Sequence, residues 1–290
     1  MNVAFDPWIP VVTTSGKLVL ASLCDVLTKG EQFVDLAVRP HERVALMRLF
    51  LCIAHAALSG PKDYDEWCEV PDRFPEAVLK YLTDWKDSFE LFHKEKPWLQ
   101  IAGLSKSANG KTPPTAIENW TPVSKLNFSL ATGNNATLFD HSGMSESRGI
   151  TLSETVLSML AFQCFLPGAF ISQVYWNGKQ SGKSSKDSPC VPASMIHALL
   201  RGKNLLGTIH LNLPTYEDVQ FSYGERGFGK PVWEMMPTSM TDSAKVENAT
   251  ATYVGRLVPM TRLILLHPSL ERMLLGDGLI YPTFTDGFPP

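Results

Sequence analysis

The chain has 290 residues, of which 44% are apolar and 19% charged, so it can bury a sizeable core as one large domain or two small ones, and its composition argues against disorder. Its 26 basic and 29 acidic side chains give a formal net charge of −3, which argues against a free-standing nucleic-acid binder that relies on overall positive charge. Any contact with DNA must therefore be local or shared with partners.

The N-terminal residues lack a basic region, and aspartate and proline interrupt their apolar stretch, which is not the pattern of a secretory signal. The longest apolar run, residues 46–58, is far shorter than the ~20 residues of a membrane span. We therefore expect a cytoplasmic protein without membrane contact. Five cysteines lie far apart without a CxxC pair, which predicts reduced, mostly buried thiols and no metal or cofactor.

The first 60 residues predict a hairpin followed by a helix. Two β-rich runs flank a turn at residues 13–16, which indicates a hairpin over residues 3–20. A helical pattern then runs from Pro40 to a stop at Gly60, and its apolar residues cover most of its surface, so this helix should be buried. His55 within it is interpreted as a hydrogen-bonded core histidine.

Residues 63–93 predict a second helical region, which Pro71 and Pro75 should break. Its inner face is expected to carry the aromatic side chains of Trp67, Tyr81, Trp85, Phe89 and Phe92. Residues 103–149 are rich in small polar residues, glycine and proline, and this stretch is much longer than the ~4–6 residues of an ordinary connection. We interpret it as a long loop that is either functional or partly disordered.

A Thr-x-x-Glu capping box at Thr151 predicts a helix that stops at Pro167 and Gly168. The pattern then predicts a second long loop at about 177–189, a helix over 192–200, a strand over 205–213 and an ordered run over 253–266. Helices and strands alternate without the regularity of βαβ units. The expected fold class is therefore α+β, with mixed helices and short strands.

Sequence signatures of common enzymes are missing. No HExxH, GxSxG or GxGxxG motif occurs. Residues 177–184 imitate a Walker A loop, but Asn177 stands where the first glycine is required, and no apolar strand ending in a magnesium-binding aspartate follows. The pattern favours a binding or scaffold protein over an enzyme.

Positive charge gathers locally between residues 171 and 203. This stretch contains five basic residues and one acidic residue, Asp187, so its net charge is +4 in a chain that is acidic overall. The basic residues are Lys179, Lys183, Lys186, Arg201 and Lys203. Interleaved glycine and serine would let such a loop follow a phosphate backbone closely. A solvated loop without a ligand is the alternative.

Seven segments, in order along nearly the whole chain, resemble the CasA family, the large subunits of type I-E CRISPR Cascade surveillance complexes. The first segment carries the Trp-Ile-Pro sequence at Trp8. The segments are residues 2–11, 134–141, 162–168, 188–202, 206–213, 231–234 and 253–259. The resemblance implies that residues 1–290 form a single, incomplete CasA-like N-terminal domain, and that the family's C-terminal four-helix bundle is absent from this chain.

The resemblance also implies a function without catalysis. Members of this family recognise the protospacer-adjacent motif in duplex DNA, help to start strand separation and recruit the helicase-nuclease. The expected partners are CRISPR RNA, the other Cascade subunits, double-stranded target DNA and that nuclease. This division of labour is physically sensible, because guide pairing reads the long sequence and protein reads only a short duplex element.

By position, the family's motif-reading glycine loop falls on Gly168, Ala169, Phe170 and Ile171. The family has several glycines in this loop, whereas this chain has only Gly168. Phe170 would either insert at a base step or pack internally. The DNA backbone contacts are expected from the lysines at 179, 183 and 186.

The family's mobile loop falls on about residues 138–148. Its aromatic and polar start, which is implied to contact the guide RNA handle and neighbouring subunits, consists of Leu138, Phe139, Asp140 and His141. The family's DNA-contacting lysine and glutamine wedge are expected near or beyond Pro290.

Two other classes of function remain open, a nucleotide-dependent enzyme that uses the lysine loop and a scaffold that contacts only protein.

Overall fold

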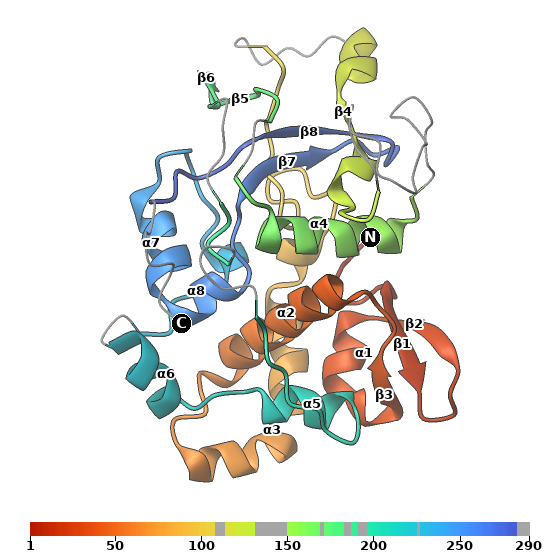
Figure 1. Cartoon of the computed structure of the whole chain (residues 1–290), viewed down its shortest axis with the longest axis vertical. Coiled ribbons are helices and arrows are strands. Elements are labelled where there is room, and N and C mark those ends of the chain that lie inside the picture. Colours follow the sequence, from red (N-terminus) through yellow and green to blue (C-terminus); the bar gives the residue numbers. More distant parts are fainter. Residues whose placement is uncertain are drawn as a thin grey trace.

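A computed structural model describes residues 1–107, 114–130, 150–168, 171–182, 187–190, 196–224 and 227–282 (Figure 1). Helices alternate with short strands along these residues, and the strands form three small antiparallel sheets. The α+β class predicted from the sequence is confirmed. In the described part of the chain, no helix is both long and apolar enough to cross a bilayer.

The N-terminal sheet has the strand order β2-β1-β3 and contains the predicted hairpin. Its strands are β1 (Ile9–Thr13), β2 (Leu18–Ala21) and β3 (Phe33–Leu36), and the β1–β2 turn uses Gly16 at a φ of 79°. The short helices α1 (Leu23–Thr28) and η1 (Gly30–Gln32) connect β2 to β3. Trp8, just before β1, is fully buried and donates its indole N–H to the carbonyl of Val3 at 2.7 Å.

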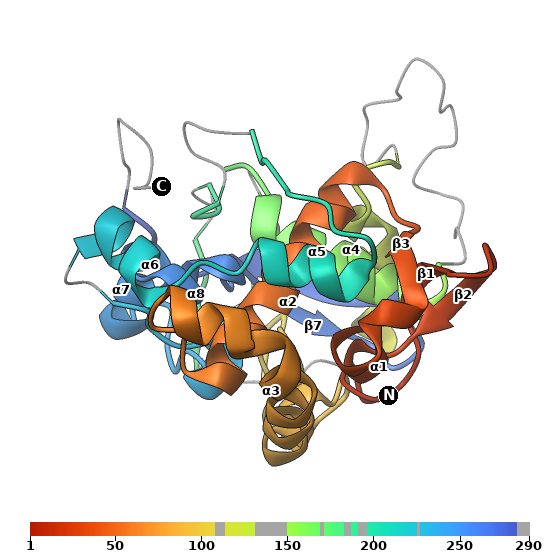
Figure 2. The ribbon, with the colours of Figure 1, turned by 90° about the horizontal axis from the view of Figure 1, so that it is seen from below.

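Helix α2 (Pro40–Leu58) lies at the centre of the molecule and is buried, as predicted. Proline at its first position starts the helix without loss of a hydrogen bond, and Ser59 ends it in the left-handed conformation. Helices α3, α4 and α8 pack around it, as Figure 2 shows from below. The predicted stop near Gly60 is therefore correct.

Helix α3 (Tyr64–Asp84) runs without interruption through Pro71 and Pro75, so the predicted break is wrong. A proline inside a helix leaves the carbonyl four residues earlier without its N–H partner. For Pro71 this is the carbonyl of Trp67, and the imidazole Nε2 of His210 lies 2.9 Å from it. Because a carbonyl can only accept, Nε2 carries the proton and replaces the missing donor.

The predicted aromatic face of residues 63–93 is only partly buried. Tyr81 and Phe89 lie in the core, Trp67 and Trp85 are half-buried, and Phe92 is 39% exposed. Phe89 and Phe92 lie beyond the end of α3, where the 3₁₀ helix η2 (Lys86–Phe89) replaces the α-helical geometry. The helical spacing therefore does not extend to Phe92.

The stretch 103–149 was predicted as one long loop, and its described residues correct this in part. They contain the 3₁₀ helices η3 (Pro114–Asn119) and η4 (Val123–Leu126) and the short strand β4 (Thr121–Pro122). Strand β4 pairs with β8 (Arg272–Asp277), which also pairs with β7 (Arg262–Leu266). This pairing across about half the chain could not be read from local sequence.

Helix α4 (Leu152–Phe165) begins with the predicted capping box, in which Thr151 and Glu154 exchange hydrogen bonds. The helix is buried from residue 155 to residue 165. In Figure 1 it lies between α2 and the β7–β8 pair. Its two-sided burial agrees with its mainly apolar sequence, in which the buried polar residues are Thr155, Ser158 and Gln163.

Residues 205–213 were predicted as a strand, but they form helix α5 (Leu205–Leu211). The side chain of Asn204 accepts from the N–H of Gly207 at 2.8 Å and caps the helix, while Leu205 and Ile209, four residues apart, face the core. Tertiary packing and this cap overrode the apolar, strand-like composition. The predicted helix 192–200 is also wrong where it is described, since residues 196–200 are not helical.

The remaining elements complete the fold. They are β5 (Tyr175–Trp176), β6 (Lys179–Gln180), α6 (Tyr216–Tyr223), η6 (Val232–Glu234), α7 (Ser243–Ala251) and α8 (Tyr253–Leu257). Buried apolar side chains from both halves of the described chain form one continuous cluster, which reaches from Val3 to Leu275. The ordered run predicted over 253–266 is thus a helix followed by strand β7.

His55 departs from the prediction, because it is buried in the core without a hydrogen bond. It is 3% exposed, packs against the rings of Phe228 and Tyr253 at 5.0 and 5.1 Å, and neither ring nitrogen has a hydrogen-bond partner among the described residues. Burial lowers the pKa of His55 from 6.5 to about 3.

The lowered pKa of buried His55 predicts that the folded protein loses stability at acidic pH. Between the pKa of about 6.5 in the unfolded chain and about 3 in the folded one, only the unfolded state binds the proton, so stability falls as pH falls through this range. At pH 5 the free energy of unfolding should be lower than at pH 7 by about 2 kcal/mol from this residue. Urea denaturation at both pH values should show that His55→Leu removes this loss, while His93→Leu keeps it. An unchanged pH dependence in His55→Leu would refute the assignment.

Candidate nucleic-acid interface

The candidate interface begins where helix α4 ends. The N–H of Leu166 still donates to the carbonyl of Phe162, and Pro167 then stops the helix, as the sequence predicts. Gly168 follows and is exposed. The chain therefore emerges at the surface directly from a buried, rigid helix.

A buried glutamine fixes the end of this helix. Gln163 is fully buried, and its side-chain amide donates to the carbonyls of Leu99 and Arg262 at 3.2 and 3.0 Å. Its side-chain oxygen accepts from the N–H groups of Thr261 and Arg262 at 2.8 and 2.9 Å. All four hydrogen-bonding positions of the amide are used. The side chain thus joins α4 to the start of β7 and to residue 99.

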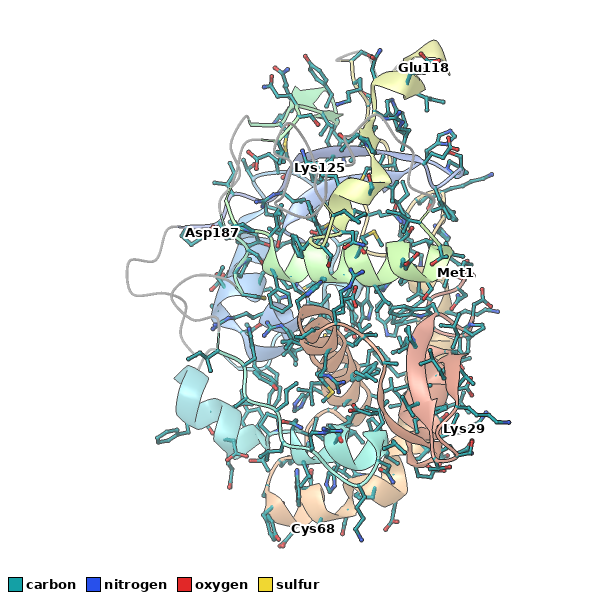
Figure 3. The ribbon with its side chains drawn as sticks, turned by 45° about the vertical axis from the view of Figure 1, so that its right-hand side comes forward. Met1, Lys29, Cys68, Glu118, Lys125 and Asp187 are labelled. Atoms are coloured by element: carbon teal, nitrogen blue, oxygen red, sulfur yellow. The ribbon has the colours of Figure 1, made fainter. Side chains whose placement is uncertain are left out.

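The three residues after α4 are each held by a different group. The carbonyl of Leu166 accepts from the backbone N–H of Ser188 at 3.0 Å, and the carbonyl of Pro167 accepts from the Arg262 guanidinium at 3.1 Å. The N–H of Gly168 donates to the Asp187 carboxylate, which Figure 3 labels near the end of α4. Residues 166–168 are therefore braced from β7 and from residues 187–188.

The Arg262 side chain is an unusual buried cation. Burial lowers its pKa from 12.5 to about 10, and the carboxylates of Asp277 and Asp187 oppose this effect. The guanidinium therefore stays charged at neutral pH. Its carbonyl contacts give this charge hydrogen-bond acceptors inside the protein.

The predicted motif-reading residues are only partly described. Gly168 is exposed, whereas the side chain of Ile171 is 2% exposed, so Ile171 can offer DNA only its backbone. Ala169 and Phe170 lie outside the described residues, and so does the predicted RNA-handle loop with Leu138, Phe139, Asp140 and His141.

Lys179 lies on a β-hairpin, not in the long loop predicted for residues 177–189. Strands β5 and β6 are joined by Asn177 and Gly178, whose φ angles of 50° and 74° are those of a type I′ turn. The Asn-Gly pair is the sequence signal that could have predicted this turn. Lys179 follows the turn with an exposed side chain.

The hairpin also rules out a Walker A loop at residues 177–182. A P-loop needs a glycine-rich curve that enters a helix, whereas these residues form a turn and a strand. The hairpin is fixed to the body of the protein by paired backbone bonds between Tyr175 and Ser105, at 2.8 and 3.0 Å. The side chain of Ser172 also donates to the carbonyl of Leu275 on β8 at 2.7 Å.

The basic residues between 171 and 203 do not form one patch. Lys183 and Lys186 lie outside the described residues. Arg201, just before α5, forms an ion pair with Asp35 of β3 at 2.6 Å. The β5–β6 hairpin, which carries Lys179, lies at the opposite end of the molecule from α5 and β3 in Figure 1. Lys203, next to Arg201 on the approach to α5, is likewise far from Lys179.

All five cysteines have free thiols. Cys52, Cys164 and Cys190 are buried, and burial raises the pKa of the first two. Cys68 is exposed, so the burial predicted for most of the thiols is correct for three of the five. No group of three or more metal-ligating side chains occurs in the described ranges.

Comparison with known proteins identifies the family. The model of the family described as CRISPR-associated protein Cse1 matches residues 2–285. The chain belongs to this family. The family predicted from the sequence is therefore confirmed.

Individual relatives agree with this assignment. CRISPR-associated protein CasA/Cse1 of Thermus thermophilus is 31% identical over 294 residues, which cover 100% of this chain and 52% of that protein. The crystal structure of Thermus thermophilus CasA has a TM-score of 0.70 at 26% identity and covers 98% of this chain and 53% of that one.

A chain of a solved CRISPR RNA-guided surveillance complex shares the fold with a TM-score of 0.71 at 19% identity, over 99% of this chain and 59% of that one. The present chain thus spans about half the length of the Cse1 relatives it matches.

The Gln163 bonds predict a large stability effect. Gln163→Leu keeps the size of the side chain but leaves two buried N–H groups and two buried carbonyls without these partners, each costing roughly 1–3 kcal/mol. We expect the free energy of unfolding to fall by about 3 kcal/mol or more in urea denaturation. Gln180→Leu, at an exposed position of β6, should change it by less than about 0.5 kcal/mol. Equal effects of the two substitutions would contradict the role given to Gln163.

Proposed function

We propose that this chain is the DNA-recognition part of the large subunit of a type I-E CRISPR surveillance complex. In this proposal it recognises the protospacer-adjacent motif in duplex DNA, helps to start strand separation and contributes to recruiting the helicase-nuclease. Its partners are CRISPR RNA, the other Cascade subunits and target DNA. It acts in the cytoplasm as one domain without catalysis of its own.

The observation that carries this proposal is the Cse1 family match over residues 2–285. The likeness to a chain of an RNA-guided surveillance complex supports the same assembly for this protein. An RNA-guided complex leaves only a short duplex element for protein to read, so a subunit of net charge −3 needs few phosphate contacts of its own.

The geometry around Gly168 supports a reading element at this position. A residue without a Cβ lets the backbone approach a groove floor, and the minor groove offers a degenerate pattern that suits backbone readout. Precise readout also needs a rigid support, which the bonds to residues 166–168 provide. We place DNA at this exposed end of α4.

Lys179 supplies the accompanying backbone contact in this proposal. Its strand is fixed through β5 to Ser105, so the ammonium group projects from a rigid hairpin. Lys183 and Lys186 are expected to extend the contact. A scaffold that touches only protein remains the competing function and predicts that none of these lysines affects DNA binding.

The salt dependence of DNA binding tests the lysines. Replacing Lys179, Lys183 and Lys186 together by alanine should reduce the slope of log affinity against log salt by about 3, since each phosphate contact contributes about 0.9. The measurement is duplex binding by the assembled complex at several salt concentrations, with and without the motif. Lys17→Ala, at an exposed position of the β1–β2 turn, is the matched control and should leave the slope unchanged. An unchanged slope in the triple variant would support the scaffold.

Substitution of Gly168 tests motif reading. Gly168→Asn adds a bulky neutral side chain, and Gly168→Asp adds a similar side chain with a charge beside Asp187. In the complete complex both should lower the affinity ratio between targets with and without the motif by about fivefold or more, because one lost groove contact costs roughly 1–3 kcal/mol. Guide-RNA binding and assembly should remain intact.

Gly168→Ala and thermal unfolding provide the controls. Loss of a glycine at a helix end can cost ~1 kcal/mol of stability without any functional role. If motif discrimination survives in Gly168→Asn while the melting temperature falls, Gly168 only ends the helix and the site assignment fails. A loss of discrimination in Gly168→Asp alone would indicate repulsion between charges instead of close backbone approach.

A further inference from the structure

A second surface feature lies at the junction of α3, α6 and α8. It is a cleft of about 420 Å³, open to solvent, and we name it the aromatic cleft. Its lining residues include Tyr64, Trp67, Leu213, Asp218 and Tyr253. A volume of this size is within the range of ligand-binding clefts in proteins.

The aromatic rings of the cleft are held in place by the fold. Trp67 donates its indole N–H to the carbonyl of Leu213 at 2.9 Å and stacks on His210 at 4.0 Å. Tyr64 lies nearly parallel to Trp67 at 5.7 Å, with an interplanar angle of 16°, and remains 69% exposed. Tyr253, on α8, packs edge-on against buried His55. The rings thus form a pre-organised wall.

The charge of the cleft has one sign. Asp218 is its only charged lining residue among those the structure describes, and its carboxylate is fixed by the backbone N–H and hydroxyl of Thr215 at 2.9 and 2.8 Å. The nearby Lys62 is paired with Glu66 at 3.2 Å. Aromatic faces carry negative potential, and together with a carboxylate they attract a cation and repel phosphate.

The surroundings of the cleft resemble a protein-binding surface. Helix α6, which contributes Asp218 to the cleft, also carries exposed aromatic side chains, since Phe221 is 93% and Tyr216 42% exposed, and the lining residue Leu211 is 41% exposed. Aromatic residues that receive arginine side chains are typical of the centre of protein interfaces. The acidic neighbours Asp65 and Glu217, both exposed, add complementarity to a basic partner.

We propose that the aromatic cleft binds a lysine or arginine side chain presented by a protein partner. The cation would lie against the exposed face of Tyr64 with Asp218 as its counter-ion, while neighbouring residues of the partner contact Tyr216 and Phe221. This surface is separate from the candidate DNA interface, since it lies beside α6 at the end of the molecule away from the β5–β6 hairpin (Figure 1). The proposal does not depend on the proposed DNA function.

Saturation-transfer NMR with the purified chain tests the cation site. The probes are acetyl-arginine methylamide and its neutral counterpart acetyl-citrulline methylamide, which have the same shape. We expect saturable binding of the arginine probe and about two- to fivefold weaker binding of the citrulline probe, because citrulline carries no charge for the aromatic face to attract. Equal binding of both probes would overturn the proposal.

Matched variants locate the site. Tyr64→Leu and Asp218→Asn should each weaken arginine binding at least about threefold, whereas Glu217→Gln, which removes a neighbouring charge of the same helix, should change it by less than about twofold. If Glu217→Gln and Asp218→Asn have equal effects, the attraction is diffuse and the cleft is not a site. Circular dichroism should show that Asp218→Asn, which alters the cap of α6, remains folded; Tyr64→Leu provides a second test that leaves this cap intact.

Short peptides distinguish a protein partner from a free small cation. An arginine flanked by leucines in a glycine-serine peptide should bind at least about fivefold more tightly than acetyl-arginine methylamide, and Phe221→Ala should remove that advantage. If the peptide and the single residue bind equally, the cleft serves a free cation and the assignment to a protein partner is wrong.

Discussion

The amide of Gln163 is the interaction on which the candidate site depends. It is fully buried in an apolar surrounding, where an unpaired polar group is costly, and each of its hydrogen-bonding positions has a backbone partner. Those partners belong to residue 99 and to the beginning of β7. A small rotation of α4 would break several of these bonds at once, so the helix has one permitted position relative to the sheet.

From this fixed point the chain reaches the surface within five residues. Ser188 strengthens the support, because its hydroxyl contacts the carbonyls of Gln163 and Cys164 and accepts from Thr261, while its N–H reaches Leu166. Arg48 of α2 extends the same network. It donates to the carbonyl of Leu257 at 2.8 Å and lies 3.0 Å from the Cys190 sulfur. Gly168, whose N–H donates to Asp187, is thus connected to the central helix by groups from α2, α4, α8 and β7.

The distribution of charge gives the molecule two different ends. The hairpin with Lys179 lies near β8, whereas the N-terminal parts of α3 and α6 carry acidic and aromatic side chains around the aromatic cleft. In the proposed function, repulsion of phosphate by the second surface and attraction by the first would both orient the protein on DNA. A net charge of −3 therefore reflects the sum of unlike surfaces and says little about any one of them.

The sequence by itself determined the features that depend on neighbouring residues. The β1–β2 hairpin, the proline start of α2, the capping box at Thr151 and the stop at Pro167 all follow from local backbone chemistry, and the order of the family segments identified the family. Only the tertiary structure decided the rest. Helix α3 continues through Pro71 because His210 replaces a missing donor, residues 205–211 are helical because Leu205 and Ile209 pack into the core, and Arg201 pairs with Asp35 of β3, far along the chain. In each case the deciding partner is distant in sequence or supplied by packing, so its energy enters only when the chain has folded.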